Sequence, residues 1–165
     1  MSCTFYQGDI FQQIYKLAEN SVDVIYIDPP FGTTQCSWDE KLNWTELFAE
    51  FFRVLKVDGI LAIHCSIPFN YTLIRAAPKA PNYSWYWKKD RATNPFMAKQ
   101  QPLRNTEEIL IWYKKKCRFY PQRHGTDIRL QKSCSTKGDY YGSVSDQPWK
   151  EVVGRYYTHH LDFKR

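Results

Sequence analysis

The sequence predicts an α/β fold in which a mostly parallel sheet is flanked by helices. Apolar runs rich in β-branched residues, at 22–27 and 60–65, are separated by a segment with helical spacing of apolar residues. Strands that alternate with helical patterns indicate βαβ units, whose strands are parallel. With 165 residues, the chain has room for one substantial hydrophobic core.

The first thirty residues predict one β-α-β unit. Cys3–Tyr6 is expected to be a short strand, and Asp9 stands where the N-cap of the following helix belongs. Val22–Ile27 is then a strand with apolar residues on both faces, which is typical of a buried strand in a parallel sheet.

A second β-α-β pattern continues from Asn43, which caps a helix that is expected to end at Lys56–Gly59 with Gly59 in the left-handed conformation. Its inward residues fall at helical spacing: Trp44, Leu47, Phe48, Phe51 and Leu55. Ile60–Cys65 is the next strand, and His64 within it is interpreted as a structural residue, since no metal partner stands at useful spacing.

The last part of the predicted sheet is antiparallel. A helix opened by Pro68 turns Phe69, Leu73 and Ala77 inward. Tyr83–Lys89 and Glu108–Tyr113 are expected to be strands that pair antiparallel at the sheet edge. The polar segment 90–107 between them is too long for a simple hairpin.

The most informative stretch follows the strand Val22–Ile27. The apolar run stops at Asp28, and Pro29 and Pro30 cannot continue a ladder of backbone hydrogen bonds. The chain must therefore leave the sheet at its carboxyl edge, where open α/β sheets place their ligands. A carboxylate, rigid backbone carbonyls and the aromatic ring of Phe31 are presented together there.

These groups suit one kind of chemistry. The exocyclic amine of a nucleobase is a poor nucleophile, because its lone pair is delocalised into the ring. Asp28 and the carbonyl of Pro29 can each accept one amine proton, which favours a more tetrahedral nitrogen able to attack a methyl group. Phe31 offers a stacking surface for a base taken out of its helix.

The tetrapeptide Asp28-Pro29-Pro30-Phe31 resembles the catalytic motif of the amino-directed DNA methyltransferases, which act on adenine N6 or cytosine N4. The longer string 28–39, DPPFGTTQCSWD, resembles a phage-type and bacterial subgroup. A plain strand-to-turn exit is the alternative, but a chance D-P-P-aromatic occurs about once in 100,000 positions. The resemblance implies a Rossmann-like S-adenosylmethionine-dependent methyltransferase fold in the permuted order, which places this motif near the amino terminus.

The resemblance also implies site roles. Asp28, Pro29, Pro30 and Phe31 would be catalytic, and Asp9 and Asp28 would contact S-adenosylmethionine, although capping alone also explains Asp9. The loop holding Trp38 would lie over the target base. In segment 90–107, Pro102-Leu103-Arg104 and Glu107 match the family, whereas Thr106 stands where the family has His.

Composition agrees with a nucleic-acid surface. The net charge is +6 and the sequence pI about 9.0, with 12 Tyr, 10 Phe and 6 Trp, although a merely basic protein would show the same charge. We expect contacts to double-stranded DNA from eight cations and one ring: Lys89, Arg91, Lys99, Arg104, Lys115, Arg118, Arg123, Arg129 and Trp38. An exposed basic tail is the alternative for those after Lys114.

Two domains are predicted: a partial catalytic domain, 1–116, and a loop-rich target-recognition segment, 117–165. None of the seven glycines forms the G-x-G loop with which the family holds S-adenosylmethionine. In the permuted order that loop would follow residue 165, so the chain matches roughly the first two-thirds of a full enzyme. A second chain or segment would supply it.

The sequence therefore predicts direct methyl transfer to a flipped base, adenine N6 in preference to cytosine N4. A non-catalytic DNA-binding subunit, or methylation of an amine on RNA or protein, remains open. The five cysteines form no C-x-x-C pair and are interpreted as reduced thiols. A restriction-modification role in a bacterial, archaeal or phage-infected cytoplasm is expected, with no metal and no membrane segment.

Overall fold

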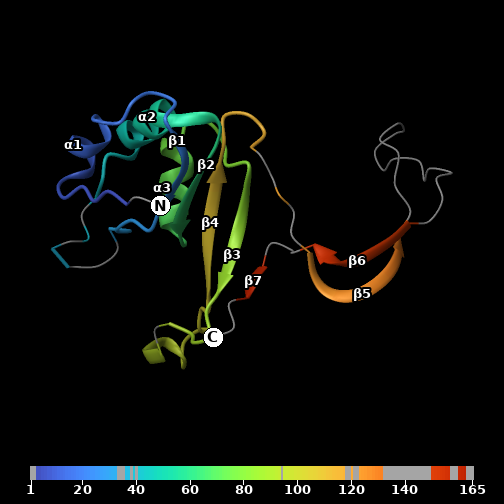
Figure 1. The fold of residues 1–165 in the computed structure, drawn as a ribbon. Coiled ribbons are helices and arrows are strands. Elements are labelled where there is room, and N and C mark those ends of the chain that lie inside the picture. Colours follow the sequence, from blue (N-terminus) through green and yellow to red (C-terminus); the bar gives the residue numbers. More distant parts are fainter. Residues whose placement is uncertain are drawn as a thin grey trace. The chain divides into compact units, whose positions relative to one another are not determined.

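The computed structural model describes residues 3–32, 36, 37, 39, 41–93, 95–117, 120, 123–131, 150–156 and 160–162. It divides into two compact units: Met1–Phe119 with His159–Arg165, and Tyr120–Thr158. The described residues of the first unit form three α-helices, one short 3₁₀ helix and a five-stranded sheet in the order β1-β2-β4-β3-β7 (Figure 1). The second contains the two-stranded sheet β5-β6.

The expected β-α-β connection is confirmed. Strand β1 (Val22–Ile27) pairs in parallel with β2 (Leu55–Cys65), and α2 (Trp44–Val54) connects them. Strand β4 (Thr106–Trp112) is antiparallel to both β2 and β3 (Tyr83–Lys88). The antiparallel part is internal rather than confined to the edge, because β7 (His160–Asp162) adds in parallel outside β3.

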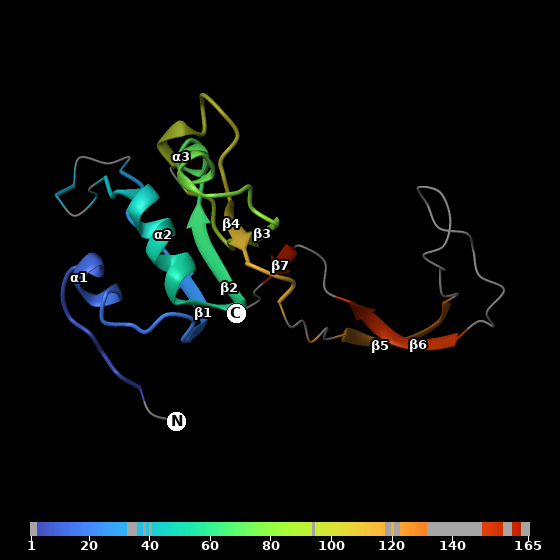
Figure 2. The same cartoon turned by 90° about the horizontal axis from the view of Figure 1, so that it is seen from above.

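The main core lies between the helices and one face of the sheet. Helix α2 begins at the cap Asn43, whose side chain accepts from the amide of Glu46, and it buries all four of the predicted inward residues that it contains. Helix α3 (Phe69–Ala76) adds buried Phe69 and Leu73. Figure 2 shows α2 lying along β1 and β2. This amphipathic packing forms the larger of the two hydrophobic clusters among the described residues.

Helix α2 ends at Val54, before the segment Lys56–Gly59 at which the sequence pattern predicts its end. Strand β2 begins directly at Leu55, and a register irregularity precedes the pairing of Val24 with Ile60. Gly59 is therefore a strand residue and not a left-handed helix cap. Its role is close approach: an added Cβ would lie 2.8 Å from the backbone oxygen of Asp23.

Two expectations for the amino-terminal region are wrong. Cys3–Tyr6 is not a strand: the segment is exposed and forms no ladder with the described residues. Strand β1 is not buried on both faces, and Val24 and Tyr26 are both about 60% exposed. The physical reason is that β1 is an edge strand of the described sheet, so its apolar residues have a neighbouring strand on one side only.

Aromatic residues of β3 cover the opposite face of the sheet. The side chains of Tyr83, Trp85 and Trp87 pack against Ala62, Ile109 and Ile111. The predicted antiparallel pairing of the β3 and β4 segments is confirmed from Tyr83↔Ile111 to Lys88↔Thr106.

The second unit is more regular than the sequence pattern indicates. Strands β5 (Arg123–Gln131) and β6 (Lys150–Tyr156) pair antiparallel where a loop-rich segment was expected. A two-stranded ribbon needs no strictly apolar face, so it leaves a weak hydrophobic period in the sequence. Within the described residues, none of the helices has the length and apolar character of a membrane-spanning segment.

Candidate functional site

Three loops leave the sheet at the edge where β1 and β2 end. Strands β1 and β2 are parallel, and Cys65 at the end of β2 is paired with Glu108 near the start of β4. Lys88 at the end of β3 is paired with Thr106. The segments that follow β1 and β2, and the loop 89–105 with the short 3₁₀ helix η1 (Pro95–Met97), therefore share this carboxyl edge.

Asp28 occupies the place that the sequence predicts. The last register pair of β1 is Ile27↔Ile63, and Asp28 follows it directly. Its side chain is exposed and forms no hydrogen bond or ion pair with other described residues, whereas the adjacent Pro29 is buried. The buried proline holds the backbone in place, so the carboxylate is presented to solvent from a rigid support.

Phe31 is only partly available as a stacking surface. Its ring stacks on Phe69, the first residue of α3, with centroids 4.8 Å apart and planes inclined by 17°. Phe69 in turn meets the edge of Trp44 at 5.4 Å. One face of the Phe31 ring is thus used inside the protein, and the half-buried ring keeps a single face for a ligand.

The residue that follows the Asp28–Phe31 motif is also held in place by a hydrogen bond. The amide of Gly32 donates to the Asp39 carboxylate over 2.6 Å, and Asp39 is only 8% exposed. Gly32 has a φ of +63°, a conformation that glycine adopts without strain. A cavity of about 410 Å³ opens beside these residues, lined by Pro30, Phe31, Lys41, Trp44, Phe69 and Thr72 among others. This volume is in the range of small-molecule sites.

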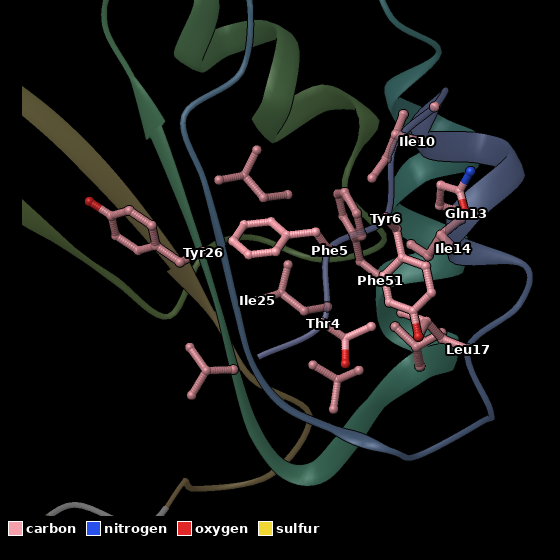
Figure 3. A pocket seen from close by; sticks show the side chains of 15 residues that line it. Thr4, Phe5, Tyr6, Ile10, Gln13, Ile14, Leu17, Ile25, Tyr26 and Phe51 are labelled. Carbon is pink, nitrogen blue, oxygen red and sulfur yellow. The ribbon is translucent and has the colours of Figure 1, made fainter. Parts of the chain in front are cut away.

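A second, larger cavity of about 700 Å³ lies along β1 (Figure 3). It is lined mainly by apolar side chains of the amino-terminal segment, α1 (Ile10–Ile14), β1 and α2, including Phe5, Ile14, Ile25 and Phe51. The carboxylate of Asp9, between the lining residues Gly8 and Ile10, accepts from the amides of Phe11 and Gln12. Capping is therefore its observed contact, and the cofactor contact stays a prediction.

A polar cluster beside Asp28 was not predicted. His64, 3% exposed, has its Nε2 in hydrogen-bond contact with the Tyr26 hydroxyl and its Nδ1 3.5 Å from the Glu107 carboxylate, which also pairs with Lys89. Burial, then the charges of Asp28 and Glu107, raise the pKa of Tyr26 above its ordinary value. No sequence spacing links these residues, because they come from β1, β2, β4 and the position that follows β3.

The predicted DNA-contacting residues differ in availability. Arg91, Lys99 and Arg104, called here the loop cations, are exposed in loop 89–105 at the carboxyl edge, and Lys115 is also exposed. Lys89 is engaged by Glu107 and lies 5.2 Å from the centroid of the Trp87 ring. The remaining predictions, Trp38, Arg118 and the side chains of Arg123 and Arg129, lie outside the described part of the structure.

Solved structures of DNA methyltransferases share this fold. M1.HpyAVI aligns with a TM-score of 0.53 at 20% identity over 74% of this chain and 62% of its own. Its complex with SAM gives 0.50 at 19% identity, over 82% and 62%. The PvuII DNA methyltransferase, which is cytosine-N4-specific, gives 0.50 at 17% identity, over 74% and 51%.

These similarities show that the chain has the Rossmann-like α/β fold of the S-adenosylmethionine-dependent methyltransferases. It spans about three-fifths of the length of M1.HpyAVI and about half that of the PvuII enzyme. No family model matches the sequence, and neither does any curated protein.

Proposed function

We propose that this chain carries the catalytic and target-contacting part of a DNA methyltransferase that methylates the exocyclic amine of a flipped base. Adenine N6 is the first candidate target. The observation that carries the proposal is the exposed Asp28 carboxylate, which follows β1 directly at the carboxyl edge and is supported by a buried proline. The shared fold of M1.HpyAVI and the PvuII enzyme supports it.

The proposed chemistry needs a base held beside Asp28. The Asp28 carboxylate and the Pro29 carbonyl each accept a hydrogen bond from the amine, so that the nitrogen lone pair becomes available. The free face of Phe31 stacks on the base, and the adjacent 410 Å³ cavity receives it. Rigid placement of these acceptors lowers the entropic part of the barrier.

S-adenosylmethionine would supply an electrophilic methyl group. The 700 Å³ cavity beside β1 fits the apolar and aromatic parts of such a molecule, because its lining is mainly apolar. Asp9 and Asp28, each adjacent in sequence to a lining residue, are the proposed polar contacts of the cofactor.

A further segment or second chain would complete the cofactor site. Strand β1 has no backbone partner on its outer side among the described residues, and its exposed apolar side chains border the larger cavity. An unpaired apolar edge is a template for an added strand. The solved methyltransferases contain chain beyond the part that aligns here, which supports this proposal.

Cytosine N4 is the second candidate target, because the PvuII enzyme of the same fold is cytosine-N4-specific. A DNA-binding subunit without catalysis is the third. In each of these three cases the proposed partner is double-stranded DNA. The proposed setting is a restriction-modification system in the cytoplasm of a bacterium, an archaeon or a phage-infected host.

The decisive experiment compares Asp28→Ala with Asp23→Ala. Asp23, within β1, is exposed, and among the described residues its carboxylate pairs with Lys56 on the surface. We expect Asp28→Ala, which removes the side-chain acceptor, to abolish methyl transfer from labelled S-adenosylmethionine to DNA in the complete protein, with Asp23→Ala fully active. Retention of transfer in Asp28→Ala would contradict the catalytic assignment. Transfer to RNA or protein instead of DNA would contradict the substrate.

Calorimetric titration with S-adenosylmethionine tests the cofactor site in this 165-residue chain. Binding in the micromolar range would show that the described cavity suffices. This chain alone could also fail to bind. If binding then appears when a polypeptide corresponding to the unaligned part of the solved enzymes is added, the remaining cofactor contacts belong to that polypeptide. Absence of binding in both cases would contradict the proposed cofactor.

A further inference from the structure

We propose that His64 is a positioning residue for the strand end that carries Asp28. The backbone ladder between β1 and β2 has its last register pair at Ile27↔Ile63. Beyond it, Pro29 and Pro30 have no N–H groups and cannot donate to further ladder bonds. Strand ends without such support fray, and the Tyr26–His64 contact lies at this point.

The surroundings of His64 determine which nitrogen carries its proton. The buried Nδ1 has no hydrogen-bond partner among the described residues, and it lies 3.5 Å from the Glu107 carboxylate, which can only accept a hydrogen bond. In the neutral ring, a proton on Nδ1 therefore faces this acceptor, which leaves Nε2 as an acceptor. The Tyr26 hydroxyl must then be the donor in the Tyr26–His64 hydrogen bond.

The charges around Tyr26 agree with this direction. Burial, followed by Asp28 and Glu107, raises the pKa of the Tyr26 phenol, so that it keeps its proton and remains a donor. The Tyr26 and His64 rings also meet edge to face, with centroids 5.1 Å apart. Tyr26 is thus held to β2 by both its ring and its hydroxyl.

The cluster connects all four main strands at the carboxyl edge. His64 on β2 contacts Tyr26 on β1, faces Glu107 on β4 and meets the Trp87 ring of β3 at 5.8 Å. Glu107 is held in turn by Lys89. A histidine that is 3% exposed and fixed by partners on three other strands has little freedom, so it can transmit rigidity to the end of β1.

Asp28-Pro29-Pro30 is therefore anchored on both sides. Upstream, Tyr26 is tied to His64; downstream, the Phe31 ring stacks on Phe69. On the proposed function, the upstream anchor sets the position of the Asp28 carboxylate against the target amine. Displacements of about 1 Å in such a group can cost about a hundredfold in rate.

Two substitutions of His64 separate its two contacts. His64→Asn keeps an amide nitrogen near the Nδ1 position and loses the acceptor for Tyr26. His64→Gln keeps a side-chain oxygen near the Nε2 position and loses the donor toward Glu107. Tyr26→Phe removes the same hydrogen bond from an exposed residue, which keeps the test independent of the folding of the His64 variants.

The test is hydrogen exchange and imidazole ¹⁵N NMR on the labelled chain. We expect the wild-type His64 ring to carry its proton on Nδ1 and to be unprotonated on Nε2. His64→Asn and Tyr26→Phe should raise exchange at residues 25–27 about two- to tenfold, as for one lost hydrogen bond. Exchange at residues 109–112 on β4 should stay unchanged, and His64→Gln should keep wild-type protection at 25–27.

A proton on Nε2 in the wild type, or equal changes at 25–27 and 109–112 in all three variants, would overturn the proposal. In the complete enzyme, His64→Asn should lower kcat at unchanged KM for DNA, and His64→Gln should restore it. Absence of transfer in the wild-type enzyme would contradict the proposed function, whereas the exchange and NMR results would still decide the role of His64.

Discussion

Phe31 has two possible uses, and substitution can separate them. The ring stacks internally on Phe69 and, in the proposed function, on a target base with its other face. Phe31→Leu keeps apolar volume and removes the ring. An aromatic pair contributes about 0.5–1.5 kcal/mol beyond the area that it buries, so we expect a coupling of this size with Phe69→Leu in a double-mutant cycle of urea unfolding.

Base stacking is measured separately. Single-stranded oligonucleotides of dA or dC present their bases without flipping, so no recognition sequence is needed. A stacked base contributes about 1–3 kcal/mol, which predicts an affinity about five- to 150-fold lower in Phe31→Leu by fluorescence anisotropy. Phe69→Leu, which keeps the free face of Phe31, should retain most of the affinity. Equal affinity of Phe31→Leu and the wild type would refute the stacking role, and a coupling near zero would refute the internal stack.

Three further predictions follow from the described geometry. Replacing the three loop cations together by Gln should lower the affinity for duplex DNA. The slope of log K for DNA binding against log salt concentration, measured by fluorescence anisotropy, should decrease in magnitude by up to about 2.7. An unchanged slope would show that these residues do not contact DNA. Burial, with a contribution from Glu108, raises the pKa of Cys65 from 9.0 to about 12, so the thiol stays protonated in the folded chain while the unfolded chain ionises. Between pH 9 and 12, the unfolding free energy of the wild type should therefore fall by up to about 4 kcal/mol more than that of Cys65→Ala. The same pH dependence of unfolding free energy in both proteins would contradict this. Gly59→Ala should destabilise the fold by about 1–3 kcal/mol in urea, because its Cβ would meet the backbone oxygen of Asp23, whereas the exposed Val57→Ala should change stability by less than about 0.5 kcal/mol.

Local patterns were sufficient to predict the elements that position the site. Val22–Ile27 is a strand with the predicted bounds because its β-branched residues end at two prolines. Helix α2 follows from apolar residues at helical spacing behind the cap Asn43. The placement of Asp28 at the carboxyl edge follows from these two elements alone, since parallel strands joined by a helix end at the same edge.

Tertiary structure decided what each of these residues contacts. The sequence could not show that β1 is an edge strand of the described sheet, because an apolar run looks the same with one neighbouring strand or two. It could not show that Phe69 covers one face of Phe31, or that His64 meets Tyr26 across 38 residues of sequence. Such contacts depend on strand order and register, which are set by packing over the whole sheet, whereas helix caps and strand ends depend on a few adjacent residues.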